Sequence, residues 1–80
     1  MSNSIIVYSR DGCPYCDKIK TILDQREIPY TLNELDVTFT REEFYAEFGV
    51  GTTFPQVIFN DENIGGCTEA VRYFHENNII

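Results

Sequence analysis

The spacing of hydrophobic positions changes along this 80-residue chain and predicts an order of strands and helices. Residues 4–9 (SIIVYS) are β-branched and apolar on both faces, which is typical of a buried central strand. Over residues 14–25 the apolar positions recur at helical spacing, and Pro14 suits the first turn of a helix. We expect this helix to end before Ile28-Pro29, because the residue that precedes a proline disfavours helical geometry.

The second half of the chain predicts a helix, a β-hairpin and a last helix. A weakly alternating strand is expected around residues 30–34. Thr40 and Glu43 form a capping-box pattern, which predicts the start of a helix that ends at Gly49. Two strands are expected at residues 56–60 and 63–65, with a turn at residues 61–62 between them. A last helix is expected at residues 68–76.

These elements follow the order β-α-β-α-β-β-α and form a single domain over residues 1–80. One parallel crossover followed by a hairpin predicts an α/β fold with a four-stranded mixed β-sheet and helices on both faces. The composition is 42% hydrophobic, with five tyrosines and six phenylalanines, so the chain can bury a core.

Composition and charge argue against several classes of protein. No apolar stretch approaches the ~20 residues of a membrane helix, and the polar residues 1–4 do not predict a signal peptide. Three cysteines, an odd number, fit poorly with a secreted disulfide framework. We therefore expect a soluble cytoplasmic protein without a membrane partner. The net charge of −7 argues against a nucleic-acid partner, because binding phosphates requires Lys and Arg.

Two of the cysteines, Cys13 and Cys16, enclose the segment CPYC at the start of the first predicted helix. Unpaired N–H groups and the helix dipole stabilise a thiolate at a helix N-terminus, so Cys13 is the candidate nucleophile. Cys16 lies one turn deeper on the same face, where it can resolve a mixed disulfide. Arg10 can add positive potential beside the thiolate. The least acidic part of the chain carries this pair, since residues 1–26 hold four basic and three acidic side chains.

A zinc site is the alternative interpretation of these cysteines. Cys13, Cys16, Cys67 and His75 would supply the usual number of ligands. Cys67 and His75, however, fall at opposite ends of the last predicted helix, which would hold their side chains far apart. We expect no metal and interpret Cys13 and Cys16 as a redox-active pair.

Three motifs together resemble the glutaredoxin family. They are Cys13-Pro14-Tyr15-Cys16, Thr53-Phe54-Pro55 and Gly65-Gly66-Cys67-Thr68-Glu69. The resemblance covers essentially the whole chain. It implies a thioredoxin-like fold with a four-stranded sheet flanked by three helices, a cis peptide bond before Pro55 and a glutathione site beside the nucleophile.

The resemblance also implies roles for individual residues. The backbone of Phe54 would pair with the cysteinyl unit of glutathione, and the N-terminus of the last helix would receive the γ-glutamyl carboxylate. Arg10 would face the glycyl carboxylate. The glutathione-binding residues implied in this way are Arg10, Tyr15, Thr53, Phe54, Pro55, Gly66, Cys67, Thr68 and Glu69.

Two positions depart from the family pattern. Phe54 stands where valine is usual, which predicts a bulkier groove wall, and Glu69 stands where aspartate is usual, which changes how the γ-glutamyl amine is held. Cys67 is interpreted as a small, partly buried hydrophobic residue beside the groove rather than as a regulatory thiol.

The resemblance implies a glutathione-dependent thiol–disulfide oxidoreductase with glutathione as co-substrate and no bound cofactor. Its partners would be disulfide-containing or glutathionylated proteins, with ribonucleotide reductase as a candidate client, and we expect a monomer. One alternative is a thioredoxin-like hydrogen donor that a flavoprotein reductase reduces. Another is an iron–sulfur cluster carrier, against which the Pro14-Tyr15 pair counts.

Overall fold

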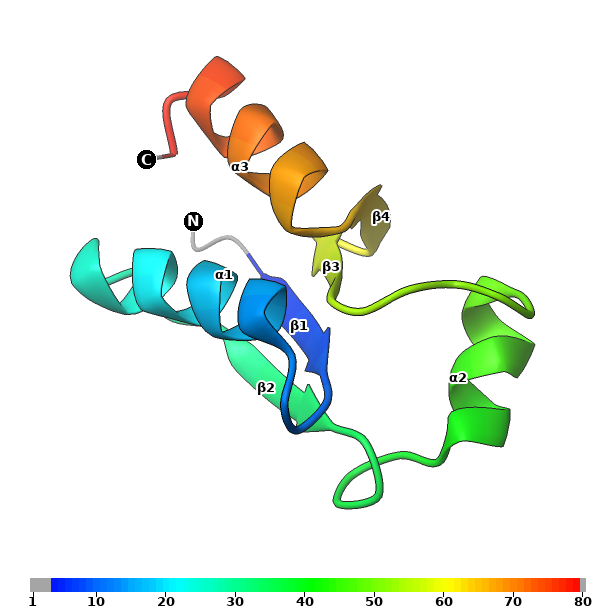
Figure 1. The fold of residues 1–80 in the computed structure, drawn as a ribbon. Coiled ribbons are helices and arrows are strands. Elements are labelled where there is room, and N and C mark those ends of the chain that lie inside the picture. Colours follow the sequence, from blue (N-terminus) through cyan, green and yellow to red (C-terminus); the bar gives the residue numbers. More distant parts are fainter. Residues whose placement is uncertain (1–3, 80) are drawn as a thin grey trace.

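The computed structural model describes residues 4–79 and contains the predicted elements in the predicted order (Figure 1). The fold class is therefore confirmed. The strands are β1 (Ile5–Ser9), β2 (Thr31–Glu34), β3 (Gln56–Phe59) and β4 (Glu62–Gly65), and the helices are α1 (Pro14–Gln25), α2 (Arg41–Phe48) and α3 (Cys67–Glu76).

The strands form one mixed sheet in the order β2-β1-β3-β4. β1 runs parallel to β2 and antiparallel to β3, and Val7 at its middle pairs with Leu32 on one side and Val57 on the other. β3 and β4 form the antiparallel hairpin. The segment SIIVYS is thus a central strand, as its continuous apolar character predicts.

One face of the sheet is covered by α1 and α3 (Figure 1). The side chains of a strand alternate between its two faces, and in β1 the fully buried set is Ile5, Val7 and Ser9. The apolar members of this set pack with residues of α1, β3 and α3. These partners are Ile19, Leu23, Val57, Phe59, Cys67, Ala70 and Phe74.

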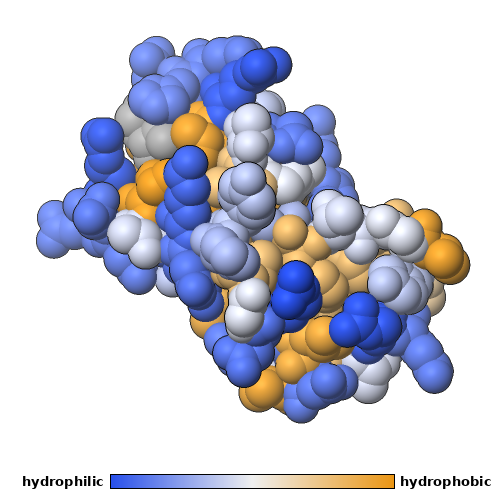
Figure 2. Space-filling model, viewed as in Figure 1, coloured by the Kyte–Doolittle hydropathy of each residue, from blue (hydrophilic) through white to orange (hydrophobic). Residues whose placement is uncertain are grey.

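The other face of β1 meets an aromatic cluster around α2. The ring of Tyr8 lies 5.1 Å from that of Phe39 and 5.0 Å from that of Phe48, centroid to centroid. Phe44 is fully buried and lies 4.8 Å from Phe48. On the surface around α2 and its flanking loops, hydrophobic residues are exposed among polar ones (Figure 1 and Figure 2). The expectation of helices on both faces is therefore confirmed.

The hairpin turn differs from its predicted position by about one residue. Asn60 and Asp61, not Asp61 and Glu62, connect β3 to β4, and both have positive φ, at 50° and 69°. Two-residue hairpin turns often require left-handed geometry at both positions, and Asn and Asp tolerate it better than Glu. β3 therefore ends at Phe59, and β4 begins at Glu62.

The helix termini explain two further boundaries. Thr40 caps α2 through a complete capping box, in which Glu43 N–H donates to Thr40 Oγ1 at 3.1 Å and Thr40 N–H donates to Glu43 Oε1 at 2.8 Å. α3 begins at Cys67, one residue before its predicted start, because Gly66 is the N-cap. Within residues 4–79, no helix combines the length and the hydropathy that a membrane crossing requires.

Replacing Thr40 with Ala should lower the free energy of unfolding by about 1 kcal/mol, because the side-chain bond to Glu43 N–H is lost. Urea denaturation followed by circular dichroism measures this change. Thr40→Ser keeps the hydroxyl and is the matched control, so it should stay close to the parent protein. Equal loss in both variants would contradict a capping role.

Candidate active site

The loop after β1 brings Cys13 to the N-terminus of α1. Gly12 has φ of +71°, a conformation that glycine adopts without steric cost, so the chain can turn sharply there. Cys13 is the N-cap residue, and Pro14 occupies the first turn, where its missing N–H is not needed. Cys13 Sγ accepts a hydrogen bond from Cys16 N–H at 3.2 Å. The cysteine sulfur thus takes the place of the oxygen of a usual N-cap side chain.

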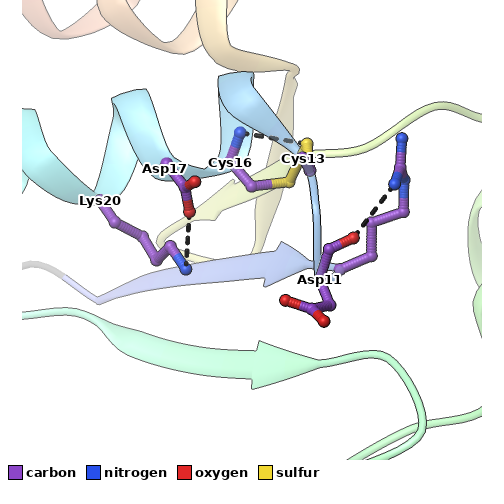
Figure 3. Close-up of polar contacts among 6 residues, drawn as sticks. Asp11, Cys13, Cys16, Asp17 and Lys20 are labelled. Carbon is purple, nitrogen blue, oxygen red and sulfur yellow. Dashed lines mark hydrogen bonds and ion pairs between the residues drawn. A yellow bond between two sulfur atoms is a disulfide. The ribbon is translucent and has the colours of Figure 1, made fainter.

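Cys13 and Cys16 are joined as a disulfide (Figure 3). Their Cα atoms are 5.2 Å apart, which lies in the usual range for a disulfide. Residues three apart at the start of a helix have about this separation. Cys67 is the free cysteine among the described residues, and it is buried. The pair that the sequence indicated as redox-active is therefore placed for reversible disulfide formation.

Cys16 is less exposed than Cys13, as expected, but Cys13 is itself buried. The exposed fraction is 3% for Cys13 and 0% for Cys16. The capping geometry is the physical reason, because it turns Cys13 Sγ back toward the backbone of the first helical turn.

A shallow groove of about 140 Å³ adjoins the CPYC segment, since Tyr15 is part of its wall. It is lined by every residue that the resemblance assigned to glutathione binding except Arg10. These residues are Tyr15, Thr53, Phe54, Pro55, Gly66, Cys67, Thr68 and Glu69. Tyr15 is 60% exposed and so presents its ring to solvent and to incoming molecules. The three sequence motifs thus converge on one surface feature.

The Thr53–Pro55 side of the groove is held by β3 and β4. The Phe54–Pro55 peptide bond is cis, which confirms the implication of the resemblance. Gln56, a buried polar residue, donates from Nε2 to the carbonyl oxygen of Thr53 at 2.9 Å. Asn63 in turn donates from Nδ2 to Gln56 Oε1 at 3.3 Å. These bonds connect the loop to the hairpin and restrict its movement.

The opposite side of the groove depends on two glycines before α3. A Cβ atom at Gly66 would lie only 3.3 Å from the carbonyl oxygen of Pro55, so glycine allows the two sides to approach closely. Gly65 has φ of +99°, and a Cβ there would lie 2.9 Å from Cβ of Glu69. The side chain of Glu69 therefore packs over this glycine pair, beside the N-terminus of α3.

Phe54 does not simply thicken the groove wall, as the sequence suggested. Its ring stacks on Phe44 with centroids 4.2 Å apart and an interplanar angle of 17°, and it lies 6.1 Å from the ring of Phe39. The large side chain is therefore directed into the aromatic cluster of α2. This packing fixes the position of the Phe54 backbone.

Arg10 is the predicted binding residue that the groove does not include. It lines a separate cavity of about 470 Å³ beside the active-site loop, together with Asp11, Asp17 and Lys20. Arg10 Nη1 donates to the carbonyl oxygen of Asp11 at 3.2 Å, and Lys20 Nζ lies 3.5 Å from Asp17 Oδ1 (Figure 3). Both acidic and basic groups therefore surround the loop that carries Cys13.

Cys67 differs electrostatically from a thiol placed for nucleophilic attack. Burial raises the pKa of the Cys67 thiol, and the nearby charge of Glu69 adds to this increase, whereas Lys18 opposes it. A higher pKa leaves less of the reactive thiolate at neutral pH. Its 6% exposed fraction agrees with the interpretation of Cys67 as a hydrophobic residue beside the groove.

The zinc alternative finds no geometric support. Cys67 and His75 lie at the two ends of α3, where His75 is exposed. Within the described part of the chain, no three side chains of His, Cys, Asp or Glu are grouped so that they could hold a metal ion.

The residues that support the Thr53–Pro55 side of the groove were not predicted from the sequence. Gln56 was assigned only to a strand, although a polar residue next to Pro55 and before an apolar run is a signal that could have been noticed. The stacking of Phe39 and Phe44 on Phe54 left no such signal, because it joins segments that are separate in the sequence.

Comparison with known proteins agrees with this geometry. A family model described as Glutaredoxin matches residues 5–64. Glutaredoxin 1 of Rickettsia conorii is 39% identical over 69 residues, which cover 81% of this chain and 66% of that protein. This chain thus spans slightly less than two thirds of that relative.

Two solved structures show the same architecture. Glutaredoxin 1 from Francisella tularensis, complexed with cacodylate, superposes with a TM-score of 0.80 and 28% identity over 98% of both chains. A buckwheat glutaredoxin–glutathione complex gives a TM-score of 0.71 and 28% identity, covering 95% of this chain and 71% of that one. The structure is a thioredoxin fold with a dithiol at the start of a helix. The chain belongs to the glutaredoxin family, whose members are thiol–disulfide oxidoreductases.

Alkylation of the reduced protein should distinguish Cys13 from Cys67. Iodoacetamide should modify Cys13 with an apparent pKa below the ~8.5 of a free thiol, because the N-terminus of α1 stabilises its thiolate. Cys67 should react only at higher pH, since burial raises the pKa of its thiol above the ordinary value. Peptide mapping by mass spectrometry across pH 5–10 follows each site. Modification of Cys67 at neutral pH as fast as Cys13 would contradict the assignment.

Proposed function

We propose that this protein is a glutathione-dependent thiol–disulfide oxidoreductase that acts on protein disulfides and on glutathionylated proteins. The observation that carries the proposal is that residues of all three motifs line one groove, which Tyr15 of the CPYC segment joins, while Cys13 lies at a helix N-terminus. The likeness to a glutaredoxin solved in complex with glutathione supports glutathione as the co-substrate.

The chemistry begins with the Cys13 thiolate. It attacks one sulfur of the substrate disulfide, so that a mixed disulfide forms at Cys13 and one substrate thiolate leaves and takes up a proton. Cys16 then attacks Cys13 Sγ, which forms the Cys13–Cys16 disulfide and releases the second substrate thiol. Two glutathione molecules reduce this disulfide and leave as glutathione disulfide. With a glutathionylated protein, Cys13 takes the glutathione and a second glutathione molecule removes it.

The groove supplies complementary groups for glutathione. The backbone N–H and C=O of Phe54 can pair with the cysteinyl unit in the manner of an added strand, and the Phe44 stack keeps this backbone in place. The N-terminus of α3 offers backbone N–H groups to the γ-glutamyl carboxylate. Glu69, packed over Gly65, is available to the γ-glutamyl amine. Arg10 lies outside the groove, so its contact with the glycyl carboxylate stays a prediction.

We also propose a cytoplasmic role, because a dithiol enzyme reduced by glutathione requires a reducing compartment. The clients would be proteins that carry a disulfide or a bound glutathione, and ribonucleotide reductase is one candidate. A coupled NADPH assay with the glutathione system or with a thioredoxin-type flavoprotein reductase identifies the reductant. Turnover with the flavoprotein alone would favour a thioredoxin-like donor instead.

Replacing Cys16 with Ser should separate two activities that share Cys13. Reduction of protein disulfides should fall at least about tenfold, because a hydroxyl cannot resolve the mixed disulfide. Removal of glutathione from a glutathionylated peptide should persist, because it needs only Cys13 and a second glutathione. Both rates are measured in one preparation with glutathione in excess.

Cys13→Ser is the matched control and should abolish both activities. The trapped mixed disulfide of the Cys16→Ser variant should be visible by mass spectrometry at Cys13. If Cys16→Ser loses both activities together, Cys16 does more than resolve, and the proposed glutathione mechanism is wrong.

A further inference from the structure

Ser9 carries the one buried side-chain nitrogen or oxygen atom that has no hydrogen-bond partner within residues 4–79. Its exposed fraction is 1%, so the hydroxyl is withdrawn from bulk solvent. A buried hydroxyl without a partner is unfavourable, and native structures usually satisfy such groups. The position also interrupts the inward apolar series of β1, where Ile5 and Val7 precede it.

The topology places Ser9 beneath the first turn of α1. Ser9 is the last residue of β1, and by the alternation of the strand it shares the face of Ile5 and Val7, which pack with residues of α1. The inward residues of α1 are Cys16, Ile19 and Leu23. The chain reverses between the two elements, so the first turn of α1 lies over the carboxyl end of β1, where Ser9 is.

Cys16 is therefore the inward residue of α1 that comes nearest to this end of the strand. It is fully buried, and its sulfur is joined to that of Cys13 at the start of α1 (Figure 3). The core side chains of β1 and α1 that pack together, Ile5, Val7, Ile19 and Leu23, are apolar and offer no side-chain acceptor. The sulfur of Cys16, which carries a negative charge when it is a thiolate, is thus the candidate acceptor for the Ser9 hydroxyl.

We propose that Ser9 Oγ donates a hydrogen bond to Cys16 Sγ when the Cys13–Cys16 pair is reduced, and that formation of the disulfide removes this acceptor. The inference rests on the proposed role of Cys16 as the resolving thiol. The structure shows the disulfide state, in which the covalent bond holds Cys16 Sγ toward Cys13 and the Ser9 hydroxyl has no partner. When the bond is reduced, the two sulfurs separate, and Cys16 Sγ can turn toward the strand.

This bond would assist the resolving step. A thiolate at a fully buried position is disfavoured by desolvation, and a hydroxyl donor offsets part of that cost. Cys16 loses its proton to solvent, and its thiolate attacks Cys13 Sγ. The Cys13–Cys16 bond forms, the bond from Cys13 to the substrate breaks, and the departing substrate thiolate takes up a proton. Ser9 keeps its own proton throughout, so it is a positioning residue.

The same bond would make the disulfide a stronger oxidant. The dithiol state gains a hydrogen bond, whereas the disulfide state contains an unsatisfied hydroxyl. Removal of the hydroxyl should therefore favour the disulfide. One hydrogen bond of this kind corresponds to roughly a tenfold change in the equilibrium constant.

The test is Ser9→Ala, which removes only the oxygen atom. Parent and variant are equilibrated in dithiothreitol redox buffers, and the oxidised fraction is measured by acid quenching, thiol alkylation and mass spectrometry. We expect the equilibrium to shift about tenfold toward the Cys13–Cys16 disulfide. Resolution of a mixed disulfide at Cys13 should slow by a similar factor. Ser9→Thr keeps a hydroxyl and should restore values close to those of the parent.

Two further readouts separate this role from a structural one. Thermal unfolding of Ser9→Ala should show the disulfide form stabilised relative to the dithiol form. In a Cys16→Ser background, Ser9→Ala should leave the removal of glutathione from a peptide unchanged, because Cys16 Sγ is absent and this reaction needs only Cys13 and a second glutathione. An equal change in the thermal stability of both redox forms would overturn the inference. A shift of less than about twofold in the dithiothreitol equilibrium would overturn it as well.

The choice of dithiothreitol keeps this outcome distinct from the proposed function. If glutathione fails to reduce the protein while Ser9→Ala still shifts the dithiothreitol equilibrium, the proposed function is wrong and the role of Ser9 stands. If glutathione turnover is normal and Ser9→Ala does not shift the dithiothreitol equilibrium, the proposed function stands and the role of Ser9 is wrong.

Discussion

The site depends on the junction between β1 and α1, where a buried strand ends and a helix begins within a few residues. The helix dipole and the free N–H groups of the first turn favour negative charge at this point, and Cys13 is the N-cap. The position of β1 at the centre of the sheet fixes the junction, because β2 and β3 pair with it on both sides. The position of Cys13 at a helix N-terminus is thus a consequence of where the central strand stops.

The groove beside Cys13 is assembled from segments that are distant in the sequence. Antiparallel pairing of β1 with β3 brings the loop before Gln56 next to this end of the sheet, and β4 then brings α3 to the other side. Gly66 allows the two sides to approach, since any side chain there would crowd the carbonyl of Pro55. The stack of Phe54 on Phe44 attaches the loop to α2, so elements on both faces of the sheet contribute to one groove.

Local rules were sufficient for the order of elements and for much of the site. The period of the apolar residues, Pro14 in the first turn and the Thr40 capping box predicted the helices, because each depends on neighbours in the sequence. The direction of the Phe54 ring, the position of Arg10 outside the groove and the unpartnered hydroxyl of Ser9 could not be predicted in this way. Each depends on which distant side chain lies opposite, and only the folded chain determines that.

The central claim is that Cys13 and the groove form one glutathione site. The most direct measurement is a structure of the Cys16→Ser variant with glutathione bound to Cys13 as a mixed disulfide. The account predicts that the cysteinyl backbone pairs with Phe54 and that the γ-glutamyl carboxylate lies at the N-terminus of α3. A glutathione that extends instead into the cavity beside Arg10, without contact to Phe54 or α3, would contradict it.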